Sequence, residues 1–147
     1  MNQLSKGLLG LLLCLTTAIS YAQPADINPY KFSKLPEESI ISPSTLAAAF
    51  QYQTGEKVSI PLSDQFIFEG VVISNEQKYD NLQNIILRSE DHVMLSISKQ
   101  TEKGKRVSYT GRVIGKDIAD GFSIQRSADV YLLKKFSKEN ILQDCTF

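Results

Sequence analysis

The chain has 147 residues with 16 basic and 16 acidic side chains, so its formal net charge is 0. This balance supplies no extended basic surface of the kind that nucleic acids and anionic membranes attract. The length suits one domain that buries a core without needing disulfide bonds.

The first 22 residues have the organisation of a secretory signal peptide. Lys6 provides a positive n-region, residues 8–19 form an apolar h-region, and a Ser-Tyr-Ala sequence ending at Ala22 places small residues at the −3 and −1 positions of a cleavage site. The segment is too short for a stable transmembrane helix, and no other apolar run approaches about 20 residues. We therefore predict export to the periplasm or the cell exterior, with a mature chain of residues 23–147.

The predicted cleavage removes one of the two cysteines of the chain. Cys14 lies in the h-region, and Leu13 before it is not the small residue that a lipid-anchor cleavage site needs. Cys145 would then be the only cysteine of the mature chain, which predicts no intramolecular disulfide. Its free thiol has three open interpretations: a buried small hydrophobic group, a link between chains, or a metal ligand.

Residues 23–41 contain three prolines and few periodic apolar positions, which predicts an extended, poorly ordered leader. A helix follows. Ser42 is suited to act as its N-cap and Pro43 as its first residue, and apolar residues recur at helical spacing as far as Gly55. The pattern predicts one short helix over residues 42–54.

From residue 56 onward apolar and polar residues alternate with a period of two, which indicates strands. Pro61 interrupts the first of them, and this places that strand at a sheet edge because proline cannot donate to a ladder. The second, from Phe66 to Ile73, is apolar at both sets of alternating positions and is expected to be central. The later segments are Ile85–Leu87, Val93–Ile97, Val107–Val113, Phe122–Ile124 and Val130–Phe136.

About seven short strands joined by polar turns indicate a mainly β fold. We predict a small antiparallel meander, closed as a barrel or folded as a sandwich, in one domain over residues 42–147. Helical crossovers between parallel strands have no place in this pattern.

Two of the predicted strands share an aromatic-x-Gly-x-Val-Ile sequence. Phe68 and Gly70 begin the first copy, and Tyr109 and Gly111 begin the second. A glycine inside a strand weakens it, so a shared glycine indicates a bulge, a corner, or room for an aromatic ring across the backbone. We interpret all four residues as structural, at the corners of a curved sheet.

The sequence contains no recognisable catalytic or metal-binding constellation. His92 is the only histidine, which excludes sites with two histidine ligands, and its place between a turn and a strand indicates a solvated or hydrogen-bonded residue at the start of the strand. Asp117 and Asp120 lack the dense series of oxygen ligands that a calcium loop needs, and no Gly-x-Ser-x-Gly nucleophile elbow occurs. We therefore predict no catalytic, cofactor-binding or metal-binding residue.

A cluster of basic residues lies between two predicted strands. Glu102 interrupts it and no aromatic ladder accompanies it, so we do not expect nucleic-acid binding. Its members are Lys99, Lys103, Lys105 and Arg106.

Several of these strands together resemble a known type of domain. The two glycine-bearing strands, the alternating Val-Met-Leu-Ser-Ile-Ser strand from Val93, and the ending from Asp120 to Lys135 are similar to the β-rich N-terminal pro-regions of secreted bacterial reprolysin-like zinc metallopeptidases. The likeness covers residues 66–136, about half of the chain. Because no peptidase domain follows here, the resemblance implies a module that binds another protein, such as a peptidase, whose zinc ion the thiolate of Cys145 could approach.

Three hypotheses of function remain open. The preferred one is an exported, non-catalytic binding module with a secreted or envelope protein as partner. The second is an inhibitor or folding aid of a secreted metallopeptidase. The third is a carrier of a small apolar ligand inside a closed sheet, which would be contradicted if the interior were filled by side chains such as Phe66, Phe68, Leu95, Val113 and Phe122. An enzyme hypothesis would need Asp117 and Asp120 to converge in one cleft. The sequence indicates neither the partner nor the oligomeric state.

Overall fold

A computed structural model describes residues 30–102 and 106–139 of the chain. The predicted signal peptide, the first part of the predicted leader, Cys145, Lys103 and Lys105 lie outside the described residues. The described part contains eight strands and one helix: β1 (Glu38–Ile41), α1 (Pro43–Ala49), β2 (Lys57–Ser63), β3 (Phe66–Tyr79), β4 (Leu82–Arg88), β5 (Val93–Thr101), β6 (Val107–Gly115), β7 (Asp120–Ser127) and β8 (Val130–Ser137).

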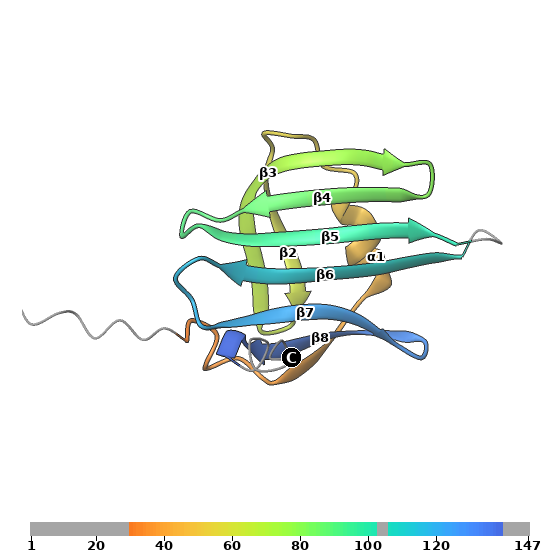
Figure 1. The fold of residues 1–147 in the computed structure, drawn as a ribbon. Coiled ribbons are helices and arrows are strands. Elements are labelled where there is room, and N and C mark those ends of the chain that lie inside the picture. The colour runs from red at the N-terminus through yellow and green to blue at the C-terminus, as the bar shows by residue number, and fades with distance from the viewer. Residues whose placement is uncertain (1–29, 103–105, 140–147) are drawn as a thin grey trace, which may run out of the picture.

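All eight strands belong to one antiparallel sheet with the order β1-β8-β7-β6-β5-β4-β3-β2. The sheet curls until its two end strands, β1 and β2, face each other, so that it forms a nearly closed barrel (Figure 1). The predicted mainly β, antiparallel fold with one short helix is confirmed, and of the two predicted forms the barrel is the one that occurs. The edge position predicted for the strand containing Pro61 is also confirmed, because β2 ends the sheet.

The segment before the helix differs from the expected leader. Residues 38–41 form β1, which pairs with β8 at the other end of the chain, and Phe32 is only 4% exposed. A four-residue strand is too short to show a period of two, and its pairing partners lie at least 90 residues away in the sequence. Local pattern therefore could not reveal this pairing.

Helix α1 begins where the sequence predicts and ends earlier. Ser42 is the N-cap, its hydroxyl oxygen accepting a hydrogen bond from the Ser44 N–H, and Pro43 is the first helical residue. The helix ends at a C-cap on Phe50, well before Gly55. Its narrow apolar stripe, which contains Leu46 and Ala49, is buried in the core.

A side-chain amide from the sheet holds the C-terminal end of the helix. Asn75 of β3 donates through Nδ2 to the carbonyl oxygens of Phe50 (3.0 Å) and Tyr52 (2.9 Å). Its Oδ1 accepts from Gln83 Nε2 of β4 at 2.9 Å. The last carbonyl groups of α1 accept from the N–H groups of the next residues, and Asn75 binds the carbonyl groups that follow them, so it ties the segment after the helix to β3.

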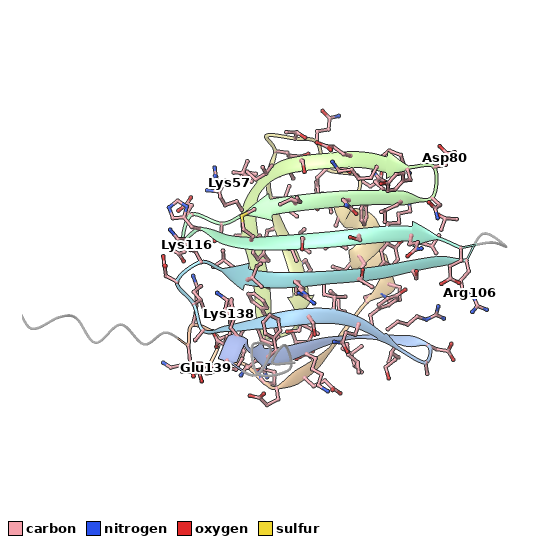
Figure 2. The ribbon with its side chains drawn as sticks, in the orientation of Figure 1. Lys57, Asp80, Arg106, Lys116, Lys138 and Glu139 are labelled. Carbon is pink, nitrogen blue, oxygen red and sulfur yellow. The ribbon has the colours of Figure 1, made fainter. Side chains whose placement is uncertain are left out.

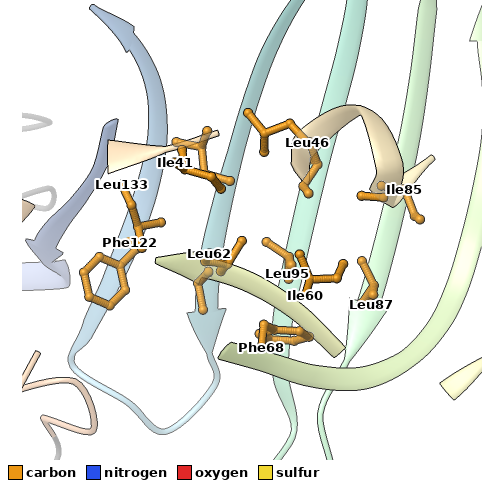
Figure 3. Close-up of a cluster of buried hydrophobic side chains, with 14 of the residues drawn as sticks. Ile41, Leu46, Ile60, Leu62, Phe68, Ile85, Leu87, Leu95, Phe122 and Leu133 are labelled. Atoms are coloured by element: carbon orange, nitrogen blue, oxygen red, sulfur yellow. The ribbon is translucent and has the colours of Figure 1, made fainter. Parts of the chain in front are cut away.

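Inward-pointing side chains fill the barrel (Figure 3). Four of the five interior positions named for the carrier hypothesis, Phe68, Leu95, Val113 and Phe122, are at most 3% exposed, and Phe66 packs against this core while partly buried. Phe32 joins Phe66 and Phe122 in an aromatic cluster with ring centroids 5.3 to 5.5 Å apart. This cluster closes one end of the barrel.

The two glycines of the shared motif lie where a neighbouring strand comes too close for a side chain. A Cβ at Gly70 would lie 2.7 Å from the Arg88 carbonyl oxygen and 3.0 Å from the Phe68 ring. A Cβ at Gly111 would lie 2.5 Å from the Ser96 carbonyl oxygen. Tight curvature of the sheet therefore requires glycine at both places.

Strand β3, which was predicted to be central, lies between β2 and β4, but only one of its two apolar faces is buried. Phe68 and Val72 point into the core, but Ile67 is 57% exposed and Ile73 38% exposed. The inner face is covered by the barrel interior, whereas no element of the described chain packs on the outer face at these residues. Apolar residues alone did not distinguish a buried face from an exposed one.

Candidate functional site

The residues singled out for chemistry do not meet in one place. His92 is an exposed turn residue with a positive φ of 59° between β4 and β5. Asp117 is exposed in the turn before β7, whereas Asp120 is 2% exposed at the start of that strand. Over residues 30–102 and 106–139, no group of three or more His, Cys, Asp or Glu side chains is placed to hold a metal ion. No helix in these ranges has the length and apolar character to cross a membrane.

Asp120 has a structural task at the closed end of the barrel. Its Oδ2 accepts a hydrogen bond of 2.8 Å from the Phe32 N–H, and both groups are buried. The second oxygen, Oδ1, is buried without a hydrogen-bond partner in the described part of the chain. The carboxylate thus fixes the segment that carries Phe32 over the aromatic cluster.

A first hollow, which we call the mouth, lies beside this cluster. Its rim carries the exposed ion pairs Lys31–Asp91 (2.6 Å) and Lys57–Glu90 (2.9 Å). The hydrogen bond and charge of Lys31 lower the pKa of Asp91, and the hydrogen bond and charge of Glu90 raise the pKa of Lys57. Figure 2 shows Lys57 at this end of the barrel. The residues that line the mouth carry three basic and three acidic side chains, so their formal charges balance.

A second hollow lies where β1 and β2 face each other, and we call it the seam groove. It is formed by the end of β1, the start of α1, the end of β2, the start of β3 and the turn between β7 and β8. Its lining comprises Ile40, Ile41, Ser42, Pro43, Thr45, Pro61, Leu62, Ser63, Asp64, Ile67, Asp129 and Val130.

The seam groove contains three of the most exposed apolar side chains. Nine large apolar side chains of the described residues are exposed, and the four most exposed are Tyr79 (70%), Ile40 (69%), Ile67 (57%) and Val130 (41%). The last three line this groove, and Ile67 also lines the mouth. Scattered exposed hydrophobic residues are ordinary on a soluble protein, but a contiguous group marks an interaction surface.

The charge of the seam groove has a single sign. Asp64 and Asp129 are both exposed, and no lysine or arginine is among the described residues that line it. Unlike the mouth, the seam groove is therefore an apolar surface with a negative rim.

The strand edges at the seam also differ in their backbone groups. The Lys135 N–H donates to the Glu37 carbonyl at 2.8 Å. Hydrogen bonding alternates along an antiparallel pair, so Glu38 and Ile40 direct their N–H and C=O groups away from β8 and toward the seam. On the facing strand, Pro61 has no N–H to donate. The described sheet has no strand between these two edges.

Sequence reasoning missed the seam groove, although one signal for it was present. The strand from Phe66 to Ile73 has apolar residues on both faces, and this was taken only as the mark of a central strand, although one of the two faces is exposed. Ile40 and Val130 gave no signal, because nothing local to them indicates that they adjoin Ile67.

Comparison of this chain with models of known protein families, with curated proteins and with solved structures finds no match. The resemblance to metallopeptidase pro-regions therefore stays a prediction from the residues alone.

Proposed function

We propose that this protein is an exported, non-catalytic binding module that recognises another protein through the seam groove. The observation that carries the proposal is the meeting of Ile40, Ile67 and Val130 in one groove, beside two unpaired strand edges. Soluble proteins normally cover or blunt both features. A partner bound in the seam groove would bury the exposed apolar side chains and also pair with an open strand edge.

The packing of the barrel supports binding at the surface over carriage of a ligand inside. The interior space is occupied by side chains such as Phe68, Leu95 and Phe122. Phe32 and Phe66 of the aromatic cluster line the mouth, and four of its charged residues form two ion pairs. Neither place combines apolar exposure with unpaired backbone as the seam groove does. A secreted peptidase is one class of partner compatible with this proposal.

Two isoleucines of β3 allow a matched test. Ile67 lines the seam groove and also the mouth, whereas Ile73, on the same strand, lines neither hollow; both are exposed. We would pass a native envelope extract over immobilised wild type, Ile67→Ser and Ile73→Ser. We expect one protein to be retained by the wild type and by Ile73→Ser, and at least about tenfold less of it by Ile67→Ser, because burying an isoleucine contributes about 1.5–3 kcal/mol. Equal retention by the two variants would refute a role for the seam groove.

A further inference from the structure

We infer that the partner inserts an extended segment into the seam, pairs it with the free edge of β1, and carries lysine or arginine beside its apolar residues. This inference rests on the proposed function and specifies the form of the partner. The backbone directions, the coverage of the facing edge and the charge of the rim support it.

Backbone groups select β1 as the edge that accepts the segment. Glu38 and Ile40 direct N–H and C=O groups toward the seam, and β1 contains neither a proline nor a bulge. The facing edge is blunted, since Pro61 lacks a donor and α1 packs beside Ser59 and Ile60 of β2. Addition of a strand to an exposed sheet edge is an established mode of peptide recognition, in which the main chain provides affinity and alternate side chains provide specificity.

The lining of the groove selects the side chains of the segment. An extended segment points alternate residues to the same side, and on that side Ile40, Ile67 and Val130 offer apolar contact. Asp64 and Asp129 flank this contact without a basic neighbour among the described lining residues. A basic residue in the segment is therefore attracted by these two aspartates, whereas an acidic residue is repelled by them.

The same charges argue against a second copy of this chain as the occupant. Two copies that paired their β1 edges would bring both seam grooves together, and Asp64 and Asp129 of each copy would then lie near those of the other. Like charges placed together at an interface oppose its formation.

A peptide titration tests the inference. The probe is a short synthetic peptide of alternating valine and threonine with a lysine at each end, added to ¹⁵N-labelled mature protein and followed by NMR. One control peptide replaces the lysines by glutamates. The other keeps every side chain but is N-methylated at alternate amides, which removes the donors of one edge. A protein variant with Asp64→Asn and Asp129→Asn tests the rim.

The lysine peptide is expected to shift the amide signals of Ile40 and Ile67 and to slow hydrogen exchange at the Ile40 amide. The glutamate peptide and the N-methylated peptide should each bind at least about tenfold more weakly. The two asparagine substitutions should remove the preference for lysine over glutamate.

The possible failures separate this inference from the proposed function. Full binding of the N-methylated peptide with shifts at Ile67 would overturn strand pairing and leave the seam groove as a docking surface. Equal binding of the lysine and glutamate peptides would overturn the basic partner. Shifts at Ile40 that grow with protein concentration alone would favour a second copy and overturn the inference. Absence of shifts at Ile40 and Ile67 with every peptide would also overturn it, while the retention experiment with Ile67→Ser decides the proposed function separately.

Discussion

Replacing Asp120 by alanine should detach the segment that closes the end of the barrel. The Asp120 carboxylate is the acceptor for the buried Phe32 N–H, at 2.8 Å. In the alanine variant this donor loses its acceptor in a buried place, where water does not easily replace the bond. Phe32 itself is held between Phe66 and Phe122, at centroid distances of 5.4 and 5.3 Å.

The expected loss of stability follows from the loss of this buried hydrogen bond. A buried donor that is left without its acceptor costs about 1–3 kcal/mol. We therefore expect Asp120→Ala to lower the free energy of unfolding by about 2–3 kcal/mol. For a domain of this size each kcal/mol corresponds to about 4 °C, so the Tm should fall by about 8–12 °C. Asp120→Asn keeps an acceptor oxygen and should lose about half as much.

The assay is urea unfolding of the mature protein followed by circular dichroism, with Asp117→Ala as the control. Asp117 is an exposed carboxylate three residues earlier, and its removal should change stability by less than about 0.5 kcal/mol. Limited proteolysis should cut the segment around Phe32 faster in Asp120→Ala than in the wild type. If Asp120→Ala and Asp117→Ala unfold at the same urea concentration, the hydrogen bond to Phe32 does not hold the segment and the reasoning fails.

Three further predictions concern the strands and the rim of the mouth. Gly111→Ala should lower the free energy of unfolding by at least about 2 kcal/mol in urea titration, because the new Cβ would lie 2.5 Å from the Ser96 carbonyl oxygen; unchanged stability would mean that the two strands separate easily. His92→Gly should raise the Tm, since φ 59° costs a histidine about 1 kcal/mol that glycine avoids, and a fall in the Tm would contradict this strain. Lys31 lowers the pKa of Asp91, so their ion pair contributes above the ordinary pKa of the aspartate and is lost as the pH falls through the lowered value. Lys31→Ala should therefore raise the pKa of Asp91 in an NMR titration, and an unchanged pKa would show that the pair does not persist in solution.

Local patterns in the sequence were sufficient to predict the start of the helix, most of the strands and the edge position of β2. Ser42 and Pro43 satisfy the needs of a helix start within a few residues of themselves. Pro61 predicts an edge strand by itself, because proline has no N–H to donate to a neighbouring strand in any context. The segment after the helix could not be predicted in this way, since the Asn75 amide that binds its carbonyl groups comes from β3.

The sequence by itself determined that this is an antiparallel β protein, because alternation with a period of two is a property of neighbouring residues. Only the tertiary structure decided that the sheet curls into a nearly closed barrel, that β1 joins β8, and that the outer face of β3 stays exposed. The candidate site belongs to this second group. Ile40, Ile67 and Val130 are far apart in the chain, and they share one groove because the two ends of the sheet meet without pairing.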